Sequence, residues 1–171
     1  MNRSDFCIDF AAIRKIDQQW SSNLYWHVVD RIFFMPWPAG PSELGEALQI
    51  APEGVRLFYL AGTIEGPVEN GGLGQYFAIR RPAWLHEMAK KAICDFGCQG
   101  VVAILSEAER YLDLNREKLY DGIPWDEWVK VMGVVAMNEA LDNINGRFLR
   151  ACYDLDGAKE RYLRKHRDRF E

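Results

Sequence analysis

The stretch Glu69-Asn70-Gly71-Gly72-Leu73-Gly74-Gln75-Tyr76-Phe77 is the most informative part of this chain. It places three glycines between two segments whose apolar residues follow a helical spacing. Glycine weakens a helix interior and is used where the backbone adopts a positive φ or passes very close to another group. Three glycines in front of an aromatic pair therefore predict a shaped corner, which we call the glycine corner (residues 69–77), rather than a slack linker.

Helical periodicity continues on both sides of the glycine corner. Apolar residues at three- and four-residue steps predict a helix over about 21–35 and another that begins near Pro52. A further helix is expected to begin at Pro82 and to end at Gly97, because proline suits a first helical turn and glycine suits the residue after the last one. The N-terminal half is therefore expected to be helical.

The C-terminal half follows the same pattern. An apolar stripe predicts a helix from about residue 104 to 119, and a turn at 121–124 precedes another helix with a break near Gly133. A last helix, about 157–169, is expected to bury Tyr162, Leu163 and His166. Since no alternating strand is found, the sequence predicts an all-α protein in which residues 1–171 form a single globular domain of about seven to nine short helices.

Composition limits the classes of function. The chain has 171 residues, 49% of them hydrophobic, and a formal charge of −4, which disfavours direct contact with nucleic acid. No apolar run is long enough for a membrane span, and the N-terminus lacks the apolar block of a signal peptide. Four cysteines in a chain of this size favour reduced thiols, so we expect a cytoplasmic protein.

Residue types that carry chemistry do not form a recognisable motif. Cys94 and Cys98 could share a helix face as half of a zinc site, but buried, inert thiols are the favoured interpretation. His27, His86 and His166 fall on three different predicted helices, and His86 lacks the second histidine one turn later that a metalloprotease helix carries. We therefore expect no catalytic residue, no metal site and no cofactor.

The glycine corner itself allows two interpretations. Successive backbone N–H groups could form an anion-binding nest. Alternatively, the Asn70 side chain caps the next helix, the glycines permit a close helix crossing, and Tyr76 and Phe77 fill the core. We favour this structural role for the motif residues Asn70, Gly71, Gly72, Gln75, Tyr76 and Phe77.

Acidic side chains concentrate in residues 104–142, where nine acidic residues accompany four basic ones. Such a run is most simply a solvated helix face. A sharper interpretation is a surface that steers a basic partner by its charge. The candidate partner-binding face consists of Glu107, Glu109, Asp113, Glu117, Asp121, Asp126 and Glu127.

At the glycine motif the chain resembles a bacterial family of unknown function that contains a DNA-mimic protein which sequesters a transcriptional repressor. Residues 140–148 and 162–166 resemble later helices of the same family, so the resemblance covers about residues 20–170. It implies an all-helical fold, homodimerisation and no known enzymatic activity. For the characterised member it also implies competition with DNA through a carboxylate surface.

Three hypotheses about function remain open at this point. The leading one is a non-enzymatic interaction module whose acidic face binds a basic protein, for example a DNA-binding regulator. The second is an immunity-type protein that neutralises a bacterial toxin. The third is a small-ligand binder or enzyme at the glycine corner that uses Asn70, Gln75 and Tyr76, which requires a pocket with converging polar groups.

Overall fold

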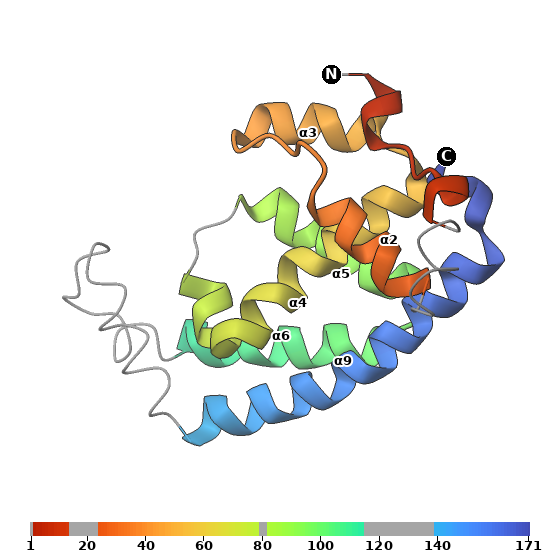
Figure 1. Ribbon diagram of the computed structural model, residues 1–171. Coiled ribbons are helices and arrows are strands. Elements are labelled where there is room, and N and C mark those ends of the chain that lie inside the picture. Colours follow the sequence, from red (N-terminus) through yellow and green to blue (C-terminus); the bar gives the residue numbers. More distant parts are fainter. Residues whose placement is uncertain (1, 14–23, 79–81, 115–138) are drawn as a thin grey trace. The chain divides into compact units, whose positions relative to one another are not determined.

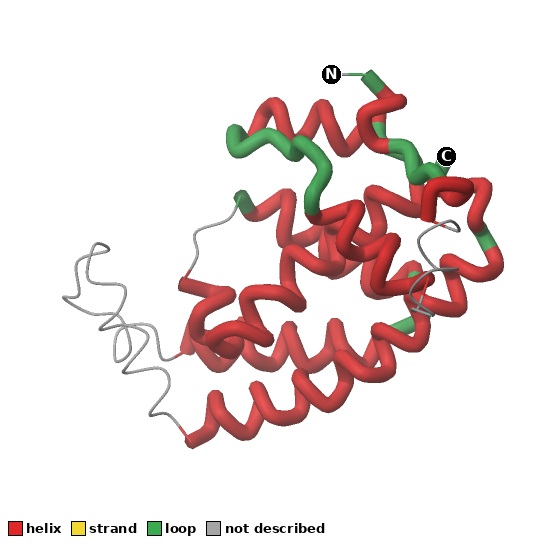
Figure 2. Tube along the Cα trace, viewed as in Figure 1, coloured by secondary structure: helices red, strands yellow, loops and turns green. Residues whose placement is uncertain are grey.

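The computed structural model describes residues 2–13, 24–78, 82–114 and 139–171, and the account below concerns these residues (Figure 1). They form helices joined by short loops, and no strand occurs among them (Figure 2). The predicted all-α class is therefore confirmed. The elements in chain order are η1 (Arg3–Phe6), α2 (Leu24–Phe33), α3 (Pro41–Ile50), α4 (Glu53–Ala78), α5 (Ala83–Asp95), α6 (Gln99–Leu114), α9 (Glu139–Lys165) and η3 (Arg167–Phe170).

Proline and glycine mark the ends of α5 as the sequence predicts, since Pro82 directly precedes this helix. The sequence did not predict α3, whose first turn holds Pro41. Gly97 follows the end of α5 with a φ of +83°, a left-handed conformation that suits glycine. The start of α3 and both ends of α5 are therefore explained by the backbone preferences of proline and glycine.

The C-terminal helix differs from the prediction. α9 runs without interruption for 27 residues, so the expected last helix over 157–169 is the end of a longer element that stops at Lys165. Leu163 is buried as predicted, whereas Tyr162 and His166 are half-buried. The predicted turn at 121–124, the helix after it and the break near Gly133 lie outside the described residues.

The chain divides into two compact units, which are described separately here. The first comprises residues 1–60 with 159–171, and the second comprises residues 61–158. Both α4 and α9 contribute residues to each unit. The prediction that the whole chain is a single domain stays a prediction.

Aromatic side chains and the two chain ends build the first unit. The fully buried Phe170 ring packs edge-on against Phe58, with 5.1 Å between ring centroids. Ile8 donates its backbone N–H to the Phe170 carbonyl at 2.8 Å, which joins the beginning of the chain to its end. Gly54 lies against the same ring so closely that a Cβ there would overlap Phe170. A side chain at position 54 is therefore excluded by packing.

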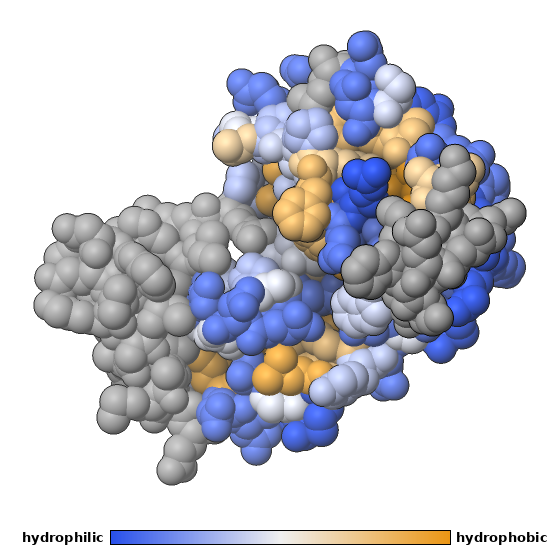
Figure 3. Space-filling view, in the orientation of Figure 1, coloured by the Kyte–Doolittle hydropathy of each residue, from blue (hydrophilic) through white to orange (hydrophobic). Residues whose placement is uncertain are grey.

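In the second unit, α5 packs against α6, and polar contacts connect α6 and the end of α4 to their neighbours. Buried apolar residues at helical spacing form the inner side of α6, at Val101, Leu105, Ala108 and Leu112. No described helix combines the length and the apolar character that crossing a bilayer requires. Figure 3 shows a face that is mainly hydrophilic among the described residues, with separate apolar areas.

Candidate functional site

The glycine corner interrupts α4 in the second unit. Gly71 has φ −158° and ψ 19°, and Gly72 has φ 74° and ψ 178°, so neither continues the helix. The conformation of Gly72 is one that essentially glycine alone adopts. The prediction of a positive φ at this motif is confirmed, and a short helical segment from Leu73 to Ala78 follows it.

The helix caps at the corner differ from the prediction. Asn70 does not cap the next helical segment; its side-chain Nδ2 donates to the Gly66 carbonyl at 2.8 Å, four residues back. The next segment is capped from α9, where Asn145 Oδ1 accepts the Leu73 N–H at 3.1 Å. The physical reason is that the residue before Leu73 is a glycine without a side chain, so an acceptor must come from elsewhere.

A close approach accounts for the second glycine. A Cβ at Gly72 would lie 3.2 Å from the amide nitrogen of Asn145. Tyr76 is 3% exposed and fills the interior as expected, whereas Phe77 and Gln75 are half-buried. The motif residues thus form a junction between α4 and α9, with Tyr76 directed into the unit.

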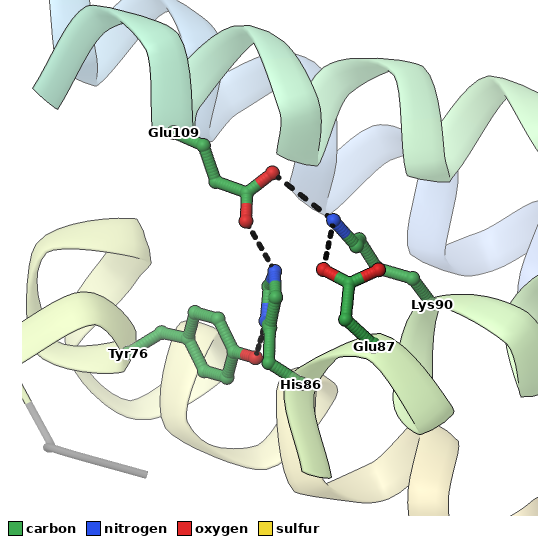
Figure 4. A network of polar contacts seen from close by, with 5 residues as sticks. All are labelled: Tyr76, His86, Glu87, Lys90 and Glu109. Carbon is green, nitrogen blue, oxygen red and sulfur yellow. Dashed lines mark hydrogen bonds and ion pairs between the residues drawn. The ribbon is translucent and has the colours of Figure 1, made fainter. Parts of the chain in front are cut away.

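Tyr76 leads to a group of polar side chains that sequence reasoning did not bring together. We call Tyr76, His86, Glu87, Lys90 and Glu109 the polar cluster (Figure 4). The Tyr76 hydroxyl hydrogen-bonds to His86 Nδ1, and His86 Nε2 lies 2.5 Å from Glu109 Oε1. A neutral His86 with its proton on Nε2 satisfies both contacts, because the Tyr76 hydroxyl then donates to Nδ1 and Nε2–H donates to the carboxylate.

Lys90 connects the two carboxylates of the cluster. Its Nζ lies 2.7 Å from Glu87 Oε1 and 3.3 Å from Glu109 Oε2. Desolvation lowers the pKa of Lys90, but the hydrogen bonds and charges of Glu87 and Glu109 outweigh this effect and raise the pKa above its ordinary value. The hydrogen bond from Lys90 holds the pKa of Glu87 below its usual range. Lys90 is thus a charged partner to both carboxylates.

The cluster reaches the surface on one side. The side chains of His86 and Lys90 are 14% and 16% exposed, and that of Glu109 is 29% exposed. Glu87 is 66% exposed and lies outermost. Solvent and small ions therefore have access to the carboxylates, while Tyr76 lies beneath them.

The polar cluster also contains potential metal ligands. One ligand atom from each of His86, Glu87 and Glu109 lies within 4.8 Å of the others. Sequence analysis predicted no metal site, because His86 and Glu109 are separated by 23 residues and match no local ligand motif. Only the packing of α5 against α6 brings them together. All four cysteines are free thiols, as expected from the sequence, but Cys94 and Cys98 are half-buried rather than buried as predicted.

The predicted acidic face stays a prediction, and the described part of α6 shows the contacts of three of its members. Glu109 belongs to the polar cluster and is paired with His86 and Lys90. Glu107 forms a two-point ion pair with Arg147 of α9, at 3.0 Å for the Nη1–Oε1 contact, and its side chain is 43% exposed. Asp113 is exposed.

Helix geometry separates these carboxylates only in part. Successive residues of a helix point about 100° apart, so Glu107 lies on a different side of α6 from Glu109, whereas Glu109 and Asp113, four residues apart, share a face. The remaining predicted members of the acidic face, Glu117, Asp121, Asp126 and Glu127, lie outside the described residues.

Comparison with known proteins gives one finding. A family model described as DMP19-like protein matches residues 50–166, which include the glycine corner, the polar cluster and all of α9. Neither a curated protein nor a solved structure shows significant similarity to the chain.

Proposed function

Because the chain belongs to the DMP19-like protein family, we propose that it is a non-enzymatic interaction module that binds a basic protein. More specifically, we propose that the partner is a cytoplasmic DNA-binding regulator. Surface carboxylates of this protein would bind the regulator in competition with DNA. A homodimer is part of the same proposal. In this proposal the protein acts by binding a macromolecule and does not catalyse a reaction at the glycine corner.

The observation that carries the proposal is that the polar groups beside the glycine corner bond to one another. Tyr76 is 3% exposed, and its hydroxyl contacts His86, which in turn contacts Glu109. Asn70 bonds to the backbone of its own helix. Side chains that hydrogen-bond to one another in this way stabilise the junction of the helices. This favours binding at the surface over binding of a small substrate by Asn70 and Tyr76.

The charge of the chain supports the same proposal. Residues 104–142 hold nine acidic side chains against four basic ones. Within this stretch, Asp113 is exposed, Glu107 shares its charge with Arg147, and Glu109 is removed from the proposed surface. The proposed contact therefore rests on Asp113 and on the acidic residues after it, such as Glu117. Surface carboxylates of this kind raise the association rate with a basic partner, and salt screens them.

The test compares two charge reversals of equal size. Asp113→Lys lies in the proposed surface, and Glu46→Lys changes an exposed carboxylate of α3 in the first unit. Each tagged protein is used to capture partners from a native extract, and the captured protein is then purified and titrated at low and raised salt. We expect weaker binding for Asp113→Lys, nearly unchanged binding for Glu46→Lys, and weaker binding for the parent at raised salt.

The identity of the captured protein separates the forms of the proposal. A regulator whose DNA complex is disrupted by the parent protein supports DNA competition, whereas a toxin supports the immunity-type alternative. A partner that binds equally well with Asp113→Lys, and without dependence on salt, would contradict the acidic contact.

A further inference from the structure

We propose that the polar cluster is a binding site for a divalent metal ion of the Zn²⁺ type. The protein ligands are His86 Nε2, one oxygen of Glu109 and one oxygen of Glu87, and Lys90 is the cation that competes with the metal for the two carboxylates. The site goes beyond the proposed function, because it requires neither a partner nor a reaction. Its role is to join α5 to α6.

The donor set fits this class of ion. One imidazole and two carboxylates are ligands that Zn²⁺ accepts, with bonds of about 2.0–2.2 Å and water in the open position. The three donor atoms already lie within 4.8 Å of one another. His86 Nε2 and Glu109 Oε1, now 2.5 Å apart, would separate by less than about 1 Å to admit an ion between them. Glu87 is the most exposed of the three and has the most freedom to turn inward.

The Tyr76 hydroxyl provides the outer contact that a metal-binding histidine needs. Imidazole ligands bind a metal through one ring nitrogen while the other is held by a hydrogen bond. Here Nδ1 of His86 is held by Tyr76, which leaves Nε2 directed toward Glu109 (Figure 4). Binding of the metal requires the other neutral tautomer of His86: the Nε2 proton is released to solvent, Nδ1 takes up a proton from solvent, and the Tyr76 hydroxyl turns so that its oxygen accepts from Nδ1–H. A hydroxyl both donates and accepts, so the same contact serves both forms.

Lys90 gives the proposal a specific signature. Its ammonium group lies between Glu87 and Glu109 at 2.7 and 3.3 Å, where it balances the charge that a metal would balance. A lysine side chain is long and flexible, so it can move toward solvent when an ion binds. Removal of the ammonium should strengthen metal binding. The metal ion then neither competes with Lys90 for the two carboxylates nor is repelled by its positive charge.

The experiment measures Zn²⁺ binding by calorimetry and Co²⁺ coordination by visible absorption, on the full chain. The variants are Lys90→Met, Lys90→Met with His86→Ala, and Lys90→Met with His27→Ala as the matched control, since His27 lies in α2 of the first unit. We expect Lys90→Met to bind Zn²⁺ about tenfold more tightly than the parent. His86→Ala should abolish this gain, and His27→Ala should leave it intact.

Thermal unfolding provides a second measurement. Lys90→Met leaves two neighbouring carboxylates without their cation, so its melting temperature should fall and should recover when Zn²⁺ is added. If Lys90→Met does not fold, Lys90→Gln, which keeps a hydrogen-bond donor, takes its place with the same expected results. The proposal is overturned if the Lys90 variant binds no Zn²⁺ or if His86→Ala leaves its affinity unchanged. It is also overturned if the Co²⁺ spectrum shows thiolate coordination from the cysteines.

Discussion

At the scale of single residues, the junction between the glycine corner and α9 depends on two side-chain properties. Gly72 combines a φ of 74° with a ψ of 178°, a conformation that a Cβ would strain. Asn145 supplies the acceptor for the Leu73 N–H, which the glycine before it cannot supply. Because Gly72 has no side chain to cap the segment that follows it, the cap comes from Asn145 on α9.

We expect Asn145→Ala to lower the free energy of unfolding by about 1 kcal/mol, the usual cost of removing a helix cap. Asn143→Ala is the matched control, because Asn143 is exposed on the same helix and the gain in helix propensity is the same for both. Urea unfolding of both variants measures the difference. Equal stability of the two variants would contradict the capping role of Asn145.

At the scale of elements, ion pairs hold α6 to its neighbours from two directions. Glu109 and Lys90 connect α6 to α5, and Glu107 and Arg147 connect α6 to α9. The hydrogen bond from Arg147 lowers the pKa of Glu107 from its ordinary value of 4.5 and outweighs the opposing effect of desolvation. Carboxylates predicted as a partner-binding face therefore act in part within the unit, where they contribute to helix pairing.

The lowered pKa of Glu107 predicts a dependence of stability on pH. A carboxyl group with a lower pKa in the folded state stabilises the protein above its unfolded-state pKa, and this contribution is lost as the pH falls through the folded-state pKa. Glu107→Gln should therefore be less stable than the parent at neutral pH, with a difference that shrinks below about pH 4. Urea unfolding across a pH series measures this.

Asp142→Asn is the control for this prediction, since Asp142 is an exposed carboxylate on α9, the helix that carries Arg147. Its difference from the parent should remain small at neutral pH. A deficit of Glu107→Gln that stays constant down to acid pH would show that the ion pair with Arg147 is not its source.

At the scale of the whole molecule, the first unit depends on contacts between the two ends of the chain. Phe170 is fully buried against Phe58, and its carbonyl accepts a hydrogen bond from Ile8. Both Ile8 and Phe170 lie outside residues 50–166, the part matched by the family. The first unit is thus completed by segments on either side of the matched region.

We expect Phe170→Ala to lower the free energy of unfolding by about 3–5 kcal/mol, as for other buried phenylalanines. Phe34→Ala, which changes a side chain that is 87% exposed, should have little effect. Hydrogen exchange would locate the loss. Exchange that increases only in residues 1–60 and 159–171 indicates units that open separately, and exchange that increases throughout supports a single cooperative domain. Equal stability of the two variants would contradict the packing role of Phe170.

The sequence by itself determined the helical class, the ends of α5, and the irregular backbone of the glycine corner. These features depend on interactions within a few residues: apolar periodicity, the ring of Pro82, and the backbone freedom of Gly72 and Gly97. Interactions of this kind can be predicted from residues that are close together in the sequence. The predicted bounds of the last helix, about 157–169, were wrong, because α9 begins at Glu139 and continues through Gly146 and Gly157 to Lys165 despite the low helix propensity of glycine.

Only the tertiary structure decided which side chains meet. Asn145 caps a segment 72 residues away, and Glu109 meets His86 across 23 residues. Arg147 pairs with Glu107 across 40 residues, a contact that the acidic stretch of sequence does not indicate. Such pairs depend on how helices pack against one another, and this packing cannot be predicted from the spacing of residues along the chain.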